Sequence, residues 1–193
     1  GYVNAFTSKE YTCVYAKVLD ERVEFAFNML ADMFFHSTFA AEEIIKERKV
    51  VLEEIKMYED TPDDIVHDLL SLASYDDHPL AMPILGTEET LQTFNQNILK
   101  DFMNKYYTPE NIVISVAGNV SENIFRQIEA HFGHYISRYS KPSVNAPVFH
   151  KKVITEKKNT EQAHLCLGFP GIPYGDDDIY DLVLLNNILG GSM

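Results

Sequence analysis

The sequence predicts an α+β fold, in which a strand pair is followed by helices, a buried strand, another helix and new strands. Three observations predict it. Residues 2–18 alternate with a period of two around a polar turn, which is typical of a β-hairpin. Helical periodicity then dominates residues 20–107. Finally, residues 111–117 form a continuous apolar run between Pro109 and Gly118, which is typical of a buried strand.

Each element has a local signal for its ends. Asp20 is the expected cap of a helix reaching Phe35, and Ser121 the cap of a helix ending at Gly133. Thr61 followed by Pro62 is typical of a helix start. The other expected elements are helices over 41–59, 62–75, 87–107 (in one or two pieces) and 178–189, strands over 153–157 and 161–169, a loop over 76–86, and a linker beginning at 139.

Composition excludes several classes of function. The 193 residues carry 16 basic against 29 acidic side chains, a net charge of −13, which disfavours nucleic-acid binding through phosphate contacts. No apolar run approaches the length of a membrane span, so we expect no membrane partner. Cys13 and Cys166 are far apart, which excludes a disulfide framework and fits a reducing compartment. Both ends interrupt a structural pattern, so we expect a fragment of a longer protein.

The helix over 41–59 carries two carboxylates on its apolar side. At 100° per residue, Glu47 and Glu54 lie on nearly one line, two turns apart, whereas Glu53 points the opposite way. The expected apolar arc around them contains Ile44, Val50, Val51, Ile55, Met57 and Tyr58, and the expected solvated side contains Lys46, Lys49, Glu53 and Lys56. Buried carboxylates need a cation, so this pattern indicates either a metal site or ion pairs with basic residues elsewhere.

Other candidate sites have weaker signals. His131 and His134 have a metal-like spacing, but they straddle a helix end and read as surface histidines. No HExxH, GxSxG, GxxxxGK[ST] or GxGxxG motif occurs. The first strand, Asn4–Thr7, is expected at a sheet edge, where it is either an ordinary edge strand or a strand that pairs with an extended peptide.

Five segments in this order resemble the insulinase/pitrilysin family of zinc peptidases, in particular its processing-peptidase-like branch. The resemblance runs nearly end to end. It is carried by NAFTSKEYT at 4–12, ERKVVLEEI at 47–55, HP at 78–79 leading to PILGT at 83–87, YTPEN at 107–111 leading to VISVAGN at 113–119, and LGGSM at 189–193.

The resemblance implies a half-molecule with a mixed or antiparallel sheet packed by helices, facing a second similar half across a peptide-binding chamber. It implies one Zn²⁺ ion, held by two histidines of an HxxEH motif and by a downstream glutamate that matches Glu54. Glu47 matches a glutamate that supports the site. The strand formed by Asn4, Ala5, Phe6 and Thr7 matches the one that pairs with the peptide substrate.

This sequence departs from the family because HxxEH occurs nowhere in it. The resemblance places that motif before Gly1, so this chain alone is expected to be inactive. Residues 1–138 would be the remainder of the N-terminal half, 139–158 a linker, and 159–193 the beginning of the C-terminal half. The expected partners are a peptide substrate, the rest of the same protein or a partner half, and a second copy in a homodimer.

The resemblance therefore predicts a zinc endopeptidase that cleaves peptides or unfolded polypeptides. The alternatives are a non-catalytic partner or scaffold subunit of the same fold, and an unrelated α+β interaction module. The expected location is a bacterial cytoplasm, with an organelle matrix as the alternative.

Overall fold

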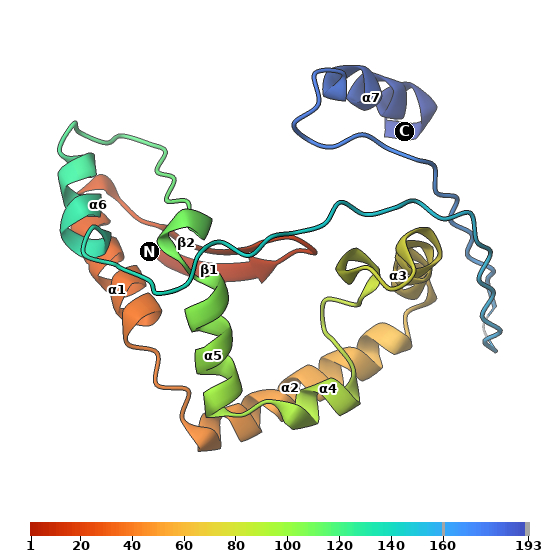
Figure 1. Ribbon diagram of the computed structural model, residues 1–193, viewed down its shortest axis with the longest axis horizontal. Helices are drawn as coiled ribbons and strands as arrows, with labels where there is room; N and C mark the ends of the chain where they lie inside the picture. Colours follow the sequence, from red (N-terminus) through yellow and green to blue (C-terminus); the bar gives the residue numbers. More distant parts are fainter. Residues whose placement is uncertain (160, 192–193) are drawn as a thin grey trace. The chain divides into compact units, whose positions relative to one another are not determined.

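The described residues contain helices and one small antiparallel sheet, joined in places by long irregular segments, which confirms the α+β class. The structure is a computed structural model that describes residues 1–159 and 161–191 (Figure 1). The chain forms two units. The first contains Gly1–Thr61 and Met82–Ala146, and the second contains Pro62–Ala81 and the chain from Pro147 onward.

The first unit begins with the predicted hairpin. Strands β1 (Tyr2–Thr7) and β2 (Thr12–Lys17) pair antiparallel, with Tyr2 opposite Lys17 and Thr7 opposite Thr12. Its helices are α1 (Val23–Phe35), α2 (Ala41–Glu59), α4 (Glu88–Thr93), α5 (Gln96–Tyr106) and α6 (Ile124–Phe132). The predicted helices over 41–59 and 87–107 are confirmed, the latter in two pieces.

Half-buried aromatic side chains form a cluster in the first unit. Phe35 at the end of α1 packs on Phe132 of α6, with ring centroids 5.8 Å apart. Phe34 contacts Tyr107, which follows α5, at 5.9 Å and Tyr135 at 5.5 Å. The Tyr135 hydroxyl also donates a hydrogen bond to the Tyr107 carbonyl. Such pairs contribute about 0.5–1.5 kcal/mol each beyond the burial of their area, so this cluster joins α1, α6 and the end of α5.

Two helix starts differ from the sequence prediction. Asp20 lies inside a 3₁₀ turn, and one of its carboxylate oxygens accepts a hydrogen bond from Asn119 Nδ2 at 2.8 Å. It therefore joins two distant segments instead of capping α1. Ser121 likewise does not cap a helix, because α6 begins only at Ile124, and the Ser121 carbonyl accepts the Ile124 amide at 3.0 Å.

The second unit contains α3 (Pro62–Tyr75), the 3₁₀ turn Pro79–Ala81 and α7 (Ile179–Asn186), which continues into a π-helical turn, Asn187–Gly191. Lys152 Nζ lies 2.8 Å from Asp76 Oδ1. The hydrogen bond from Lys152, and then its charge, hold the pKa of the Asp76 carboxyl below its usual value. Ser192 and Met193, which belong to the expected 189–193 turn, lie outside the described residues. Thr160 also lies outside them.

Three predicted strands are absent from the described part of the chain. Residues 112–117 leave the 3₁₀ turn Pro109–Asn111 with extended backbone at Ile112, but they pair with no strand, and Val113 is 90% exposed. Residues 153–157 and 161–169 likewise form no β-strand. A β-strand requires a regular ladder of backbone hydrogen bonds to a neighbouring strand. Among the described residues, only β1 and β2 form such a ladder.

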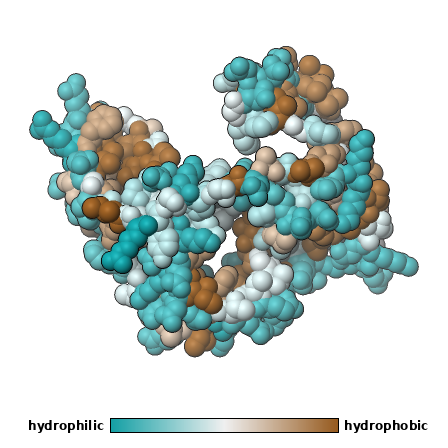
Figure 2. Space-filling model, in the orientation of Figure 1, coloured by the Kyte–Doolittle hydropathy of each residue, from teal (hydrophilic) through white to brown (hydrophobic). Residues whose placement is uncertain are grey.

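Apolar surface is correspondingly prominent. Figure 2 shows hydrophobic side chains over α7, where Tyr180, Leu184 and Ile188 are 80%, 59% and 71% exposed. None of the described helices combines the length and apolar character that crossing a bilayer requires.

Thr108 has no exposed surface, yet its hydroxyl has no hydrogen-bond partner among the described residues. It occupies the position before the 3₁₀ turn Pro109–Asn111 without capping it through its side chain. Burying an unpaired hydroxyl costs about 1–3 kcal/mol. We therefore attribute the fit of Thr108 at this position to the shape of its side chain and not to its hydroxyl.

We therefore expect Thr108→Val to raise the free energy of unfolding by about 1 kcal/mol, because valine keeps the shape and removes the unpaired hydroxyl. The matched variant Thr108→Ser keeps the hydroxyl and deletes a methyl group, so it should lower stability by about 1 kcal/mol. Urea unfolding of the gene product measures both. A valine variant less stable than the serine variant would show that the hydroxyl has a partner.

Candidate functional site

Helix α2 carries both candidate carboxylates. It runs without interruption from Ala41 to Glu59, as predicted. Glu42 and Glu43 occupy its first turn, where negative charge is favourable for the helix dipole, whereas Lys56 and Glu59 carry opposite charges in the last turn. The helix is rigid over this length, and the positions of its side chains along the axis are set by 1.5 Å per residue.

The covered face of α2 is narrower than predicted. Ile55 is buried, and Ile44, Val51 and Tyr58 are half-buried, so they form the packed side. Val50 and Met57, which were expected in the same apolar arc, are 51% and 69% exposed. The prediction was wrong there because periodicity identifies an apolar side without saying how much of it other elements cover.

Glu47 and Glu54 are exposed, so the expectation that α2 buries them is also wrong. Neither forms a hydrogen bond or ion pair with another described residue. Glu53 differs, because Lys56 Nζ lies 2.7 Å from its Oε1. That hydrogen bond, and then the Glu53 charge, raise the pKa of Lys56. The ion-pair alternative for Glu47 and Glu54 thus finds no basic partner in the described part of the chain.

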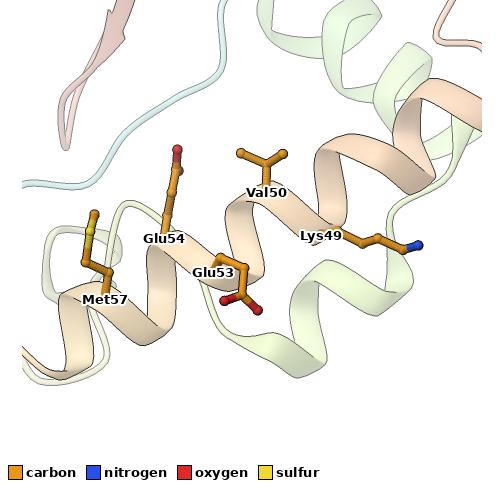
Figure 3. Close-up of a pocket in the computed structure, with 5 residues that line it drawn as sticks. All are labelled: Lys49, Val50, Glu53, Glu54 and Met57. Carbon is orange, nitrogen blue, oxygen red and sulfur yellow. The ribbon is translucent and has the colours of Figure 1, made fainter.

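Glu54 belongs to an open hollow of about 450 Å³ on α2, lined by Lys49, Val50, Glu53, Glu54 and Met57. Figure 3 shows Glu54, Val50 and Met57 projecting from one side of the helix and Glu53 from the other. The predicted opposition of Glu53 and Glu54 is therefore confirmed. In this view the Glu54 side chain lies between those of Val50 and Met57, and Lys49 points away from it.

The described residues contain no cluster of three histidine, cysteine, aspartate or glutamate side chains that could hold a metal ion. An unpaired carboxylate such as Glu54 has the donor chemistry of one zinc ligand, since Zn²⁺ accepts Asp and Glu oxygens. The chain thus fits part of a zinc site and needs further ligands from outside the described residues. The assignment of Glu54 to the metal and of Glu47 to a supporting role stays a prediction.

The predicted substrate strand lies in β1, which pairs only with β2 among the described residues. Asn4 is opposite Tyr15, and Ala5 is opposite Val14. The Ala5 amide donates to the Asn4 side chain, with N and Oδ1 2.8 Å apart. The edge of β1 that faces away from β2 is therefore open to a further strand. The Ala5 amide, however, already has a hydrogen-bond acceptor in the side chain of Asn4. A peptide-binding role for Asn4, Ala5, Phe6 and Thr7 stays a prediction.

Three of the seven histidines line a second hollow. His36, His131 and His134 line a hollow of about 420 Å³ between α1 and α6, together with Asp32. His36 Nδ1 lies 2.9 Å from Asp32 Oδ1. The rings of His131 and His134 lie against Phe27 and Phe35, at centroid distances of 6.0 and 5.0 Å. These contacts favour packing roles.

Arg48 was missed by the sequence analysis. Its guanidinium Nη2 donates to the Phe94 carbonyl at 2.7 Å, although the two residues are 46 positions apart. Its Nε is buried without a hydrogen-bond partner among the described residues. The sequence shows only that α2 contains an arginine among other charged residues. It does not show that this arginine would bind the carbonyl of Phe94.

Sequence comparison identifies relatives along the whole chain. It matches the zinc protease YmxG of Bacillus subtilis, itself uncharacterised, with 60% identity over 100% of this chain and 47% of that protein. It also matches the uncharacterised zinc protease SCO5738 of Streptomyces coelicolor, with 37% identity over 100% of this chain and 44% of that protein. The chain spans about half the length of the curated relatives it matches.

Solved structures share the fold. A protease from Helicobacter pylori superposes with a TM-score of 0.67 and 22% identity, over 76% of this chain and 36% of that one. Two family models also match. The one described as "Insulinase (Peptidase family M16)" covers residues 1–88, and the one described as "Peptidase M16 inactive domain" covers residues 93–193. The chain belongs to peptidase family M16, the insulinase family.

Proposed function

We propose that this chain is part of a zinc-dependent endopeptidase that cleaves peptides or unfolded polypeptides within an enclosed chamber. The observation that carries the proposal is the Glu54 carboxylate, which projects from α2 with no ion pair among the described residues. The 60% identity to a protein named as a zinc protease supports it. Two histidines and a general-base glutamate of an HxxEH motif would come from a segment before Gly1.

The two glutamates of α2 have different roles in this proposal. They are seven residues apart, which corresponds to about 10.5 Å along the helix axis. Glu54 would bind the metal directly, and Glu47 would order the ligands around it through hydrogen bonds. When bound, zinc polarises a water molecule and the scissile carbonyl. The outer edge of β1, residues Asn4 to Thr7, would hold the peptide extended by strand pairing.

The remaining assignments follow from the same proposal. Residues 1–138 would be the remainder of one half, 139–158 the linker, and 159–193 the start of the second half. The chamber would close with the rest of the same protein, a partner half or a second copy. We place the protein in a bacterial cytoplasm, in keeping with its bacterial relatives.

A non-catalytic partner or scaffold subunit is the second candidate. One observation favours it: the family model over 93–193 is described as an inactive domain. Such a subunit would use the same fold to complete a chamber without holding zinc itself.

We expect the coding sequence upstream of Gly1 to encode an HxxEH motif, because Glu54 alone cannot retain zinc. Reading several tens of codons upstream, with zinc analysis of the purified gene product, checks this. An upstream sequence in which the motif is missing, or its histidines are replaced, would reject the peptidase and leave the non-catalytic subunit.

Glu54→Gln in the gene product should abolish stoichiometric zinc binding and peptide hydrolysis with little loss of stability, because it removes a ligand from an exposed position. Elemental analysis and a fluorogenic peptide assay measure both effects. Glu53→Gln is the matched control, one residue away on the opposite side of α2, and should leave zinc content and turnover intact. Unchanged zinc content in the Glu54 variant would refute the ligand assignment.

Strand pairing with β1 makes a prediction about the substrate backbone. A peptide strand directs only every second amide toward its neighbour. N-methylation of amides in one alternating set should therefore reduce kcat/KM by about tenfold or more, since each lost hydrogen bond is worth about 0.5–1.5 kcal/mol. Methylation of the intervening set should have little effect. Equal losses at every amide would contradict strand pairing.

A further inference from the structure

We propose that Arg48 is the positioning residue that holds α2, and with it Glu47 and Glu54, in place for metal binding. This inference rests on the proposed function. Arg48 does not touch the metal or the substrate in this proposal. It would act by attaching the helix to the junction between α4 and α5.

Helix α2 has few apolar anchors of its own. Of its nineteen residues, only Ile55 is buried. The hollow around Glu54 is open to solvent along the same helix. A helix with so little buried area depends on specific polar contacts for its position, because most of the energy that fixes a helix comes from packing one face.

Arg48 supplies such a contact. Its Nη2 donates a charge-assisted hydrogen bond to the Phe94 carbonyl at 2.7 Å, and such bonds contribute more than neutral ones. The Nε of the same guanidinium is enclosed by protein. A lysine at this position would present a point charge on a flexible stem, which does not reproduce the planar guanidinium.

The acceptor belongs to a rigid part of the chain. Phe94 closes α4, and its amide donates to the Leu91 carbonyl at 3.3 Å. Asn95 then caps α5 by accepting the Asn97 and Ile98 amides at 3.0 and 3.1 Å. The Phe94 carbonyl is therefore held between two capped helix ends.

A second bond ties the same junction to the entrance of α2. Gln96 Nε2 donates to the Thr38 carbonyl at 2.7 Å, three residues before the helix begins. The junction thus holds α2 at its entrance and again at Arg48. From Arg48 to Glu54 the rise is about 9 Å of helix, so a fixed Arg48 also fixes the carboxylate.

The test compares Arg48→Met, Arg48→Lys and Lys46→Met in the gene product. Lys46→Met is the matched control, because Lys46 lies two residues away on α2 with its side chain 69% exposed, in a surface pair with Glu43. Amide hydrogen exchange over residues 41–59 is measured in the zinc-free protein, with α6 as internal reference. Zinc affinity is measured by competition with a chelator at a temperature well below the unfolding midpoint.

We expect Arg48→Met to speed exchange in α2 by about tenfold relative to α6, and to weaken zinc binding by about 10–100-fold. The exchange rate of α2 and the zinc affinity of Arg48→Lys should lie between those of Arg48→Met and the parent. Both quantities should be the same in Lys46→Met as in the parent. Unchanged exchange in α2 would overturn the inference. Faster exchange with unchanged zinc affinity would also overturn it, because Arg48 would then only stabilise the fold.

Failure of the proposed function is a separate outcome. A parent protein that binds no zinc refutes the peptidase, and the zinc part of this inference fails with it. Amide hydrogen exchange in α2, measured in the metal-free variants, then shows whether Arg48 anchors the helix. This measurement does not require peptidase activity.

Discussion

The aromatic cluster at the end of α1 is the contact on which the arrangement of the first unit depends. Phe34 and Phe35 bring together α6 and the residue that follows α5. With its end held there, α5 presents its start, at Gln96, to the segment that enters α2. In our proposal, the aromatic cluster thus contributes to the position of the Glu54 carboxylate, through a series of contacts that ends at Arg48.

Elements that depend on local chemistry could be predicted from the sequence. Helix α2 has the predicted ends because its residues are mostly good helix formers without glycine or proline. The opposition of Glu53 and Glu54 follows from the same periodicity. The strand predicted over 111–117 does not form, because a strand depends on a partner, and hydrophobic character alone does not supply one.

In the candidate site, too, local features could be predicted from the sequence, whereas contacts with distant residues could not. The sequence points to Glu47 and Glu54 as unusual charges on one side of a helix, yet their exposure depends on which elements cover that side. Arg48 could not be predicted at all, because a carbonyl 46 residues away leaves no periodic pattern. Under the proposed function, partners for these two exposed carboxylates would come from outside the described residues.

The hydrogen bond between the Ala5 amide and the Asn4 side chain has a consequence for the resting protein. An open strand edge is a template on which identical chains aggregate. Here a side chain of the strand itself occupies one of the donors at that edge, so an incoming strand has to displace it. A chance encounter between two copies therefore gains one backbone hydrogen bond fewer, which disfavours pairing of identical chains along this edge.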